Sequence, residues 1–170
     1  TTLFRSIEDQ TRKLFQVASL REMPIFTFVN KMDREARDPF QLLDDIENEL
    51  GIKTYPMNWP IGSGKEFKGV YERDNNRIIA FNGGNHGQNE VEAIEGTPDD
   101  PKFREILGEA LHDKLMEDIE LLDIAGDELD LEAVRNGELT PVFFGSALTN
   151  FGVEPFLEHF LEMTTAPLAR

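Results

Sequence analysis

Two short apolar runs, far apart in the chain, constrain the fold more than any other feature of the sequence. One is IFTFV at residues 25–29, and the other is TPVFF at residues 140–144. Both are continuous rather than alternating and combine β-branched with aromatic residues, which is typical of strands buried on both faces of a parallel sheet. Helical patterns lie on either side of each run, so the sequence predicts an α/β fold.

Three amphipathic patterns predict helices around these runs. The pattern before the first run consists of Ile7, Thr11, Leu14, Phe15 and Ala18. After that run, Asp38 followed by Pro39 is typical of an N-cap with proline at the first helical position, and Gly51 ends the predicted helix. The pattern after the second run consists of Pro155, Phe156, Leu157, Phe160 and Leu161.

The charge of the chain is unevenly distributed. Its 33 acidic and 17 basic side chains give a net charge of −16, and residues 85–138 alone contain 17 acidic and four basic side chains. A step of this size suggests a separate module. We therefore predict a discontinuous core, residues 1–55 and 139–170, interrupted by an acidic α+β insert at residues 56–138.

The insert has its own pattern of elements. The predicted elements are a hairpin of residues 68–71 with 77–81, an exposed strand at 90–95, one long acidic helix from residue 103 to about 126, and a short helix at 131–135. Trp59 is predicted to pack at the junction between core and insert.

Composition excludes several classes of function. A net charge of −16 argues against nonspecific binding to nucleic acid or to an anionic membrane surface, since both would repel the chain. The lack of cysteine excludes disulfides, thiol catalysis and cysteine metal sites. No apolar run reaches the roughly 18 residues of a membrane span, and no signal pattern is present, so we expect a cytosolic protein. Both ends look cut, because the chain starts at Thr1 and finishes like a linker.

Asn30-Lys31-Met32-Asp33 directly follows the first apolar run. In a parallel sheet, the loops at the carboxyl ends of strands bind ligands. An ionised Asp33 can accept two hydrogen bonds, from the ring N1–H and the exocyclic amine of guanine, a pattern that adenine does not offer. Asn30 can donate toward the purine N7 side and tie the loop to its neighbours, and the Lys31 stem can lie across the base. The alternative is a polar turn that shares N-cap duty.

A second loop, Gly145-Ser146-Ala147-Leu148, follows the second apolar run and precedes a helix. Backbone N–H groups in such a loop can donate to the O6 of guanine, an acceptor that adenine lacks. Alone, this segment would be only a turn of small residues. Together, the two loops predict a guanine site.

NKMD at 30–33 and GSAL at 145–148 resemble the guanine-recognition elements of translational GTPases. The segment between them resembles the inserted subdomain of the elongation factor G type. The stretches that resemble the termination factors of this family are residues 7–15, 28–50, 59–71 and 140–163. Residues 1–6 do not match and read as a cloning remnant. The resemblance implies the C-terminal half of a P-loop GTPase-type parallel sheet domain, with an inserted α+β subdomain.

The resemblance also implies a role for each site residue. Asn30, Lys31 and Asp33 would read guanine, and Met32 would fill the loop. Ser146 with Ala147 would close over O6, and Leu148 is implied as a further nucleotide-binding residue. GTP or GDP is the implied cofactor.

The G-x-x-x-x-G-K-[ST] phosphate-binding loop of the family does not occur in this sequence, and we expect neither its switch threonine nor its D-x-x-G switch motif in this chain. The nearest match is at residues 62–66. Aligning Gly64 and Lys65 with the motif puts Trp59 in place of its first glycine and Glu66 in place of its Mg²⁺-binding hydroxyl residue, so we interpret this segment as a turn. We therefore expect Mg²⁺ only in the intact factor, and no catalytic or metal-binding residue in this chain. The histidines lack zinc-like spacing and are expected at the surface or at caps: His86, His112 and His159.

By resemblance, the intact factor would hydrolyse GTP, act on the ribosome during termination and promote departure of the codon-reading release factors. This chain would supply guanine recognition only and would be inactive alone. Two alternatives stay open: a fragment of another elongation factor G-like GTPase, or a non-enzymatic module whose acidic insert docks a basic protein surface. We expect no membrane partner and no sequence-specific nucleic acid partner. Two parallel strands leave an unpaired edge, so we expect self-association through it or support from the insert.

Overall fold

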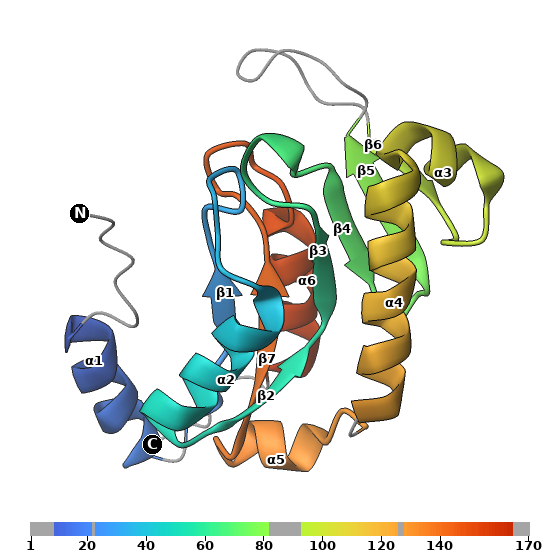
Figure 1. Cartoon of the computed structure of the whole chain (residues 1–170). Helices are drawn as coiled ribbons and strands as arrows, with labels where there is room; N and C mark the ends of the chain where they lie inside the picture. Colours follow the sequence, from blue (N-terminus) through green and yellow to red (C-terminus); the bar gives the residue numbers. More distant parts are fainter. Residues whose placement is uncertain (1–8, 22, 82–92, 126–127, 165–170) are drawn as a thin grey trace.

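The computed structural model describes residues 9–21, 23–81, 93–125 and 128–164, which contain two β-sheets (Figure 1). The strands of the parallel sheet are, in order, β1 (Thr27–Val29), β7 (Leu139–Phe144) and β2 (Lys53–Pro56). The strands of the antiparallel sheet are, in order, β3 (Asn58–Ile61), β4 (Gly69–Glu72), β5 (Arg77–Phe81) and β6 (Ala93–Gly96). The predicted α/β fold class is confirmed.

The two apolar runs occupy different positions in the parallel sheet. β7 is its central strand, and all six of its residues are buried, as the sequence predicts. The first run forms a strand only from Thr27, and the three residues of β1 are half-buried. The prediction of burial on both faces is therefore wrong for β1. The reason is its place in the sheet, because within the described residues β1 is an edge strand that pairs with β7 alone.

α2 (Pro39–Leu50) begins and ends where the sequence predicts. The Asp38 carboxylate accepts hydrogen bonds from the backbone N–H groups of Phe40, at 3.0 Å, and Gln41, at 3.4 Å. Gly51 follows the last turn with a φ of 70°. Because glycine adopts this left-handed conformation at little steric cost, the local sequence determines both helix ends.

Two other helices form at the predicted places but bury less than their apolar patterns suggest. They are α1 (Asp9–Ser19) and α6 (Val153–Met163). Leu14 of α1 is 70% exposed, although the pattern places it on the packed face. No residue of α6, all of which the structure describes, is fully buried.

The antiparallel sheet and its helices follow the prediction with one correction. The β4–β5 hairpin and α5 (Leu131–Arg135) form as predicted. Part of the predicted exposed strand forms β6, and residues 90–92 of it lie outside the described residues. The prediction of a single long helix is wrong, because two helices, α3 (Pro101–Leu107) and α4 (Glu109–Ala125), form there. Gly108 separates them with a φ of 85° and a ψ of 154°, angles outside the helical range.

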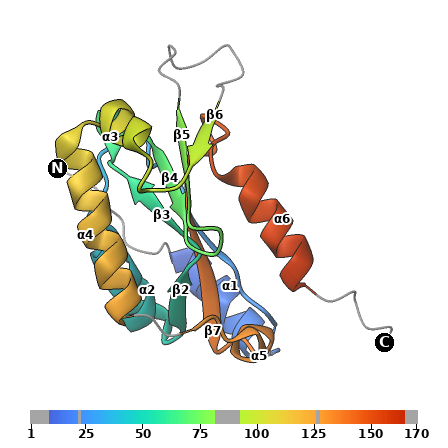
Figure 2. The same cartoon turned by 90° about the vertical axis from the view of Figure 1, so that its right-hand side faces the viewer.

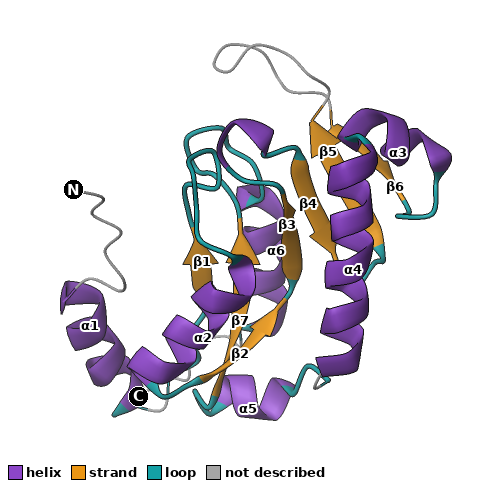
Figure 3. Ribbon diagram, viewed as in Figure 1, coloured by secondary structure: helices purple, strands orange, loops and turns teal. Residues whose placement is uncertain are grey.

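The helices and loops are arranged around the sheets in a way that fixes the position of the site. Figure 2 shows α2, α3 and α4 on one side of the two sheets and α6 on the other. Figure 3 shows that the loops following β1, β3 and β7 lie together at one end of the molecule.

Asn58 joins the two sheets where the chain passes from β2 to β3. The Met57 N–H first donates to the Val142 carbonyl, at 2.9 Å. The Asn58 side-chain amide then donates to the Phe144 carbonyl, at 3.1 Å, and accepts from the Phe144 N–H, at 2.7 Å. Because both residues are buried, a side chain here satisfies backbone groups that would otherwise lose their partners. β2 was not predicted, since its sequence, KTYP, contains no continuous apolar run.

Trp59 packs at the junction of the two sheets, as predicted. Its ring is fully buried and lies between Phe40 of α2, at 4.5 Å between ring centroids, and Phe144 of β7, at 5.6 Å. The indole N–H donates to the Asp118 carboxylate of α4 at 3.1 Å. One side chain therefore connects the helices α2 and α4 to the central strand β7.

Candidate functional site

The two loops predicted to bind guanine follow neighbouring parallel strands. β1 and β7 end in register at Val29 and Phe144, so both loops leave the same edge of the sheet. The Gly145 N–H donates to the Val29 carbonyl at 3.0 Å, and the Gly145 carbonyl accepts from the Met32 N–H at 3.1 Å. The strand ladder therefore continues into the loops and holds them side by side.

Asp33 and Ser146 form a direct link between the loops. The Ser146 hydroxyl donates to Oδ1 of Asp33 at 2.6 Å. Ser146 is fully buried, whereas Asp33 is half-buried. The second carboxylate oxygen, Oδ2, has no hydrogen-bond donor among the residues that the structure describes. The serine therefore fixes the orientation of the carboxylate and leaves it able to accept hydrogen bonds from a ligand.

Asn30 forms a second link between the loops. Its Oδ1 atom accepts from the Lys31 N–H, at 2.7 Å, and from the Ala147 N–H, at 2.9 Å. The Ala147 N–H is one of the groups predicted to donate to O6, so a guanine would share it with Asn30. The neighbouring Ser146 N–H donates to the Phe151 carbonyl at 3.0 Å. The amide NH₂ of Asn30 makes no hydrogen bond to the described part of the chain and is free to donate to a purine.

The other predicted site residues differ in exposure. Met32 is 1% exposed and fills the space beneath the loop. Lys31 is exposed and has a φ of 72°, a conformation that non-glycine residues rarely adopt outside turns and functional sites. Leu148 is 81% exposed. Lys31 and Leu148 are therefore available to contact the faces or edges of a bound base.

Sequence reasoning placed Gly145 in the second loop without giving it a role, and it missed Phe151 as a residue that shapes this loop. Gly145 has no room for a side chain, because a Cβ atom there would lie 2.5 Å from the Phe151 carbonyl oxygen and 2.8 Å from the Phe28 ring. Phe151 forms a backbone bridge with Ser146 in both directions. The glycine was a visible signal, but its close contacts depend on the packing of three separate segments.

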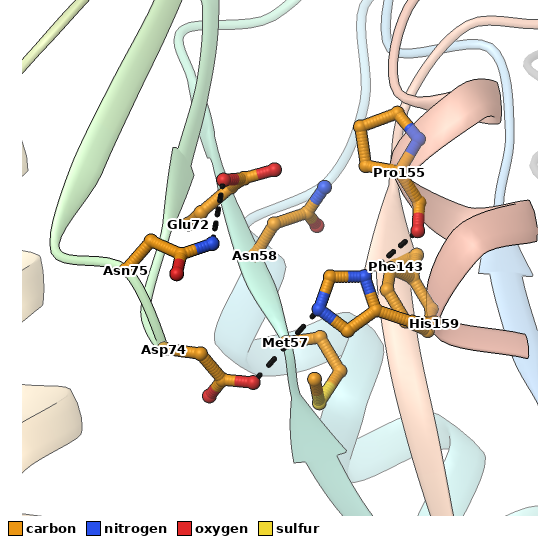
Figure 4. Close-up of a pocket in the computed structure, with 8 residues that line it drawn as sticks. All are labelled: Met57, Asn58, Glu72, Asp74, Asn75, Phe143, Pro155 and His159. Carbon is orange, nitrogen blue, oxygen red and sulfur yellow. Dashed lines mark hydrogen bonds and ion pairs between the residues drawn. The ribbon is translucent and has the colours of Figure 1, made fainter. Parts of the chain in front are cut away.

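A small pocket lies away from these loops, between the β3–β4 region and α6 (Figure 4). Its polar groups already have partners. Nδ1 of His159 lies 2.8 Å from the Pro155 carbonyl oxygen, and Nε2 lies 3.9 Å from the Asp74 carboxylate. Glu72 accepts hydrogen bonds from Arg77. We therefore assign no binding function to this pocket.

No alternative metal centre is found among the described residues. They contain no group of three or more histidine, aspartate or glutamate side chains arranged to hold a metal ion. His112 was expected at the surface or at a cap, which is wrong, since it is buried and its Nε2 lies 3.0 Å from the Pro98 carbonyl oxygen. His86 lies outside the described residues. Among the helices that the structure describes, none combines the length and apolarity that a bilayer crossing requires.

Comparison with known proteins places the chain among GTP-binding domains. The model of the elongation factor Tu GTP binding domain matches residues 4–166. Peptide chain release factor 3 of Symbiobacterium thermophilum is 52% identical over 98% of this chain. Peptide chain release factor 3 of Microcystis aeruginosa is 54% identical over 98% of this chain. The resemblance to translational GTPases, and to their termination factors, is thus confirmed.

The chain corresponds to less than a third of the length of these two relatives. The chain spans 31% of the Symbiobacterium protein and 30% of the Microcystis protein. A crystal structure of a protein from Thermus thermophilus has a TM-score of 0.63 at 24% identity, over 94% of this chain and 25% of that one, and it supports the fold alone. Because the family model matches nearly the whole sequence, the chain belongs to the elongation factor Tu GTP binding domain family.

Proposed function

We propose that this chain provides guanine recognition in a GTP-binding translation termination factor of the peptide chain release factor 3 type. The observation that carries the proposal is the pair of bonds that lock the two loops together, from Ser146 to Asp33 and from Ala147 to Asn30. Within the described part of the chain, these bonds leave a fixed carboxylate and an unpaired amide NH₂ group at the carboxyl end of the sheet. The names of the relatives, and the family match, support the same function.

In this proposal, each group meets a different edge of guanine. Asp33 accepts from the ring N1–H and the exocyclic amine, while the Asn30 amide donates toward N7. The Ala147 N–H, which Asn30 already holds in place, donates also to O6. Lys31 covers one face of the base with its aliphatic stem. Adenine would bring no matching donors to the Asp33 carboxylate and would set its exocyclic amine, a donor, against the Ala147 N–H in place of the O6 acceptor, and mismatched polar groups of this kind are costly.

The remaining parts of the factor's activity are assigned outside this chain. The described residues include no cluster fit to hold Mg²⁺, and we propose that the ion binds only in the intact factor together with the nucleotide phosphates. For the intact factor, we likewise propose that it hydrolyses GTP and that it is cytoplasmic. Its proposed partners are the ribosome and the codon-reading release factors. No residue of this chain is proposed to be catalytic.

Substitution Asp33→Asn in the full-length protein tests the proposal. An amide donates where the carboxylate accepted, so affinity for GDP should fall by about 100-fold while affinity for xanthosine diphosphate rises. Competition with a fluorescent GDP analogue measures both. Asp44→Asn, at an exposed position of α2, is the matched control and should change neither affinity. Retention of GDP affinity by Asp33→Asn would contradict the assigned role.

A second candidate function is favoured by the exposed face of α4. The exposed acidic residues of this helix are Glu109, Asp113, Glu117, Glu120 and Asp123. Such a face can dock a basic protein surface without any enzymatic activity. Titrating the chain with basic ribosomal proteins at two salt concentrations tests this candidate, because docking through these carboxylates should weaken steeply as salt rises.

A further inference from the structure

The turn between β3 and β4 contacts both guanine loops. The Gly64 N–H of this turn donates to the Met32 carbonyl, in the first loop, at 2.9 Å. The Phe67 ring meets the Phe151 ring, at the end of the second loop, edge to face with 5.9 Å between centroids. Figure 1 shows the turn, in green, beside the loops that follow β1 and β7. Residues 62–67, which we call the buttress turn, therefore touch the site although the sequence predicts only an isolated turn there.

The buttress turn has a defined shape. Gly62 and Gly64 have φ values of 75° and 61°, in the region that glycine adopts most readily. A Cβ atom on Gly62 would collide with the backbone oxygen of Glu66. The Phe67 N–H donates to the Gly64 carbonyl at 3.2 Å, which closes a short 3₁₀ turn at Gly64–Glu66. A turn constrained in this way can hold a neighbouring loop in one conformation.

The contact with the first loop is close. A Cβ atom on Gly64 would lie 3.2 Å from the Glu35 backbone nitrogen and 3.4 Å from the Arg34 carbonyl carbon. Met32, whose carbonyl the turn holds, is 1% exposed. The next residue is Asp33, so any shift of the turn would be transmitted to the carboxylate through one peptide unit.

The contact with the second loop leads to the same carboxylate. Phe67 and Phe151 are 8% and 9% exposed, so their edge-to-face contact is buried. Phe151 exchanges two backbone hydrogen bonds with Ser146, at 2.9 and 3.0 Å. The Ser146 hydroxyl in turn holds Asp33. Two chains of contacts from one turn therefore converge on the group that reads guanine.

We propose that the buttress turn positions the guanine-recognition loops, with Gly64 and Phe67 as positioning residues for Asp33. This inference rests on the proposed function and adds a role for residues outside the two loops. It predicts that guanine affinity and selectivity depend on a segment that never touches the nucleotide.

Gly64→Ala in the full-length protein tests the inference, with Gly51→Ala as its matched control. Both glycines have a left-handed φ, 61° and 70°, so both substitutions impose similar backbone strain. At Gly51, however, no described atom lies within 4 Å of the added Cβ. GDP affinity should fall about tenfold in Gly64→Ala and stay within about twofold of wild type in Gly51→Ala.

Comparison of GDP with inosine diphosphate separates positioning from general damage. Inosine lacks the exocyclic amine that Asp33 would accept from, so misplacing Asp33 should reduce the preference for GDP over inosine diphosphate. Equal losses for both nucleotides in Gly64→Ala, or GDP affinity matching the Gly51→Ala control, would overturn the inference. Failure of the wild-type protein to bind GDP would instead overturn the proposed function.

A second pair of variants covers the case in which Gly64→Ala does not fold. Phe67→Leu removes the edge-to-face contact with Phe151 and keeps an apolar side chain. Phe103→Leu makes the same change at a fully buried position in α3, away from the loops. The inference requires a reduced preference for GDP over inosine diphosphate in Phe67→Leu only, and equal preference in the two variants would contradict it.

Discussion

Two carboxylates, Glu72 in the antiparallel sheet and Asp33 in the loop after β1, have opposite environments. Glu72, at the end of β4, is 5% exposed and accepts hydrogen bonds from the Arg77 side chain at 2.7 and 2.9 Å. This hydrogen bonding raises the pKa of Arg77. Asp33 accepts one bond from Ser146 and keeps an oxygen without a donor among the described residues. Glu72 is therefore bound by its own sheet, whereas the loops proposed to bind guanine leave Oδ2 of Asp33 and the amide NH₂ of Asn30 unpaired within the described residues.

The largest expected effect on stability is at Trp59, in the junction between the regions. Trp59→Ala removes a fully buried ring and the bond to Asp118, so the free energy of unfolding should fall by about 3–5 kcal/mol. Urea denaturation followed by circular dichroism measures the loss. Trp59→Phe, which keeps most of the ring packing, should lose less. Equal losses in the two variants would show that packing is not what this side chain contributes.

Asn58→Leu should have the next largest effect. Leucine keeps the side-chain volume but leaves the buried N–H and carbonyl of Phe144 without partners, which should cost about 2–4 kcal/mol. Hydrogen exchange of the Phe144 amide, measured by NMR, should increase together with the loss of stability. An unchanged exchange rate would mean that the backbone of β7 finds another partner.

Glu72→Gln sharpens the comparison between the two carboxylates. The substitution weakens the pair with Arg77 at a buried position, so the free energy of unfolding should fall by about 1–2 kcal/mol, while GDP affinity of the full-length protein stays the same. Asp33→Asn should instead weaken GDP binding and leave the free energy of unfolding nearly unchanged. The contrast between the two regions fails if Glu72→Gln weakens GDP binding as strongly as Asp33→Asn does.

Ser146→Ala tests how far the serine hydroxyl fixes Asp33. Without the 2.6 Å bond the carboxylate can rotate, so GDP affinity should fall about tenfold. Thr149→Ala, in the same loop, is the control. Its hydroxyl donates to the Ser146 carbonyl rather than to Asp33, so the loss there should be smaller. Isothermal titration of both full-length variants distinguishes the two roles.

The smallest expected effect concerns the N-cap of α3. The backbone N–H of Lys102 lowers the pKa of Asp100, with its side chain adding to the effect. A carboxyl whose folded pKa is lowered stabilises the fold above its unfolded pKa, and this contribution is lost as pH falls through the folded value. The stability difference between wild type and Asp100→Asn should therefore be present at pH 7 and disappear well below pH 3.8. Thermal denaturation of the two proteins across this pH range measures the difference.

Much of the fold could be predicted from local signals. Asp38, Pro39 and Gly51 determine the ends of α2 through their own backbone preferences and hydrogen bonds. The apolar run of β7 predicted that this strand is buried. Gly108 was a local signal too, but the apolar periodicity on both sides of it favoured one continuous helix.

The candidate site was only partly predictable. The adjacency of the two loops follows from two parallel strands, and the strands were visible as apolar runs. A link from Asn30 to a neighbouring loop was expected, but its partner, the Ala147 N–H, was not predictable, because it depends on the geometry of two segments far apart in sequence. The contact of Gly64 with Met32 was also missed, since it depends on how the second sheet packs against the first.

The pairing of β2 with β7 also bears on how such a domain can change length during evolution. Residues 57–138 leave the parallel sheet on one strand and return to it on the adjacent strand. Closing a segment between adjacent strands costs only about 0.6 kcal/mol more for each doubling of its length. Insertions and deletions near α3, α4 and α5 should therefore be tolerated. Residues 58–67 are different, because they carry Asn58, Trp59 and the turn against the loops, and we expect their length to stay fixed.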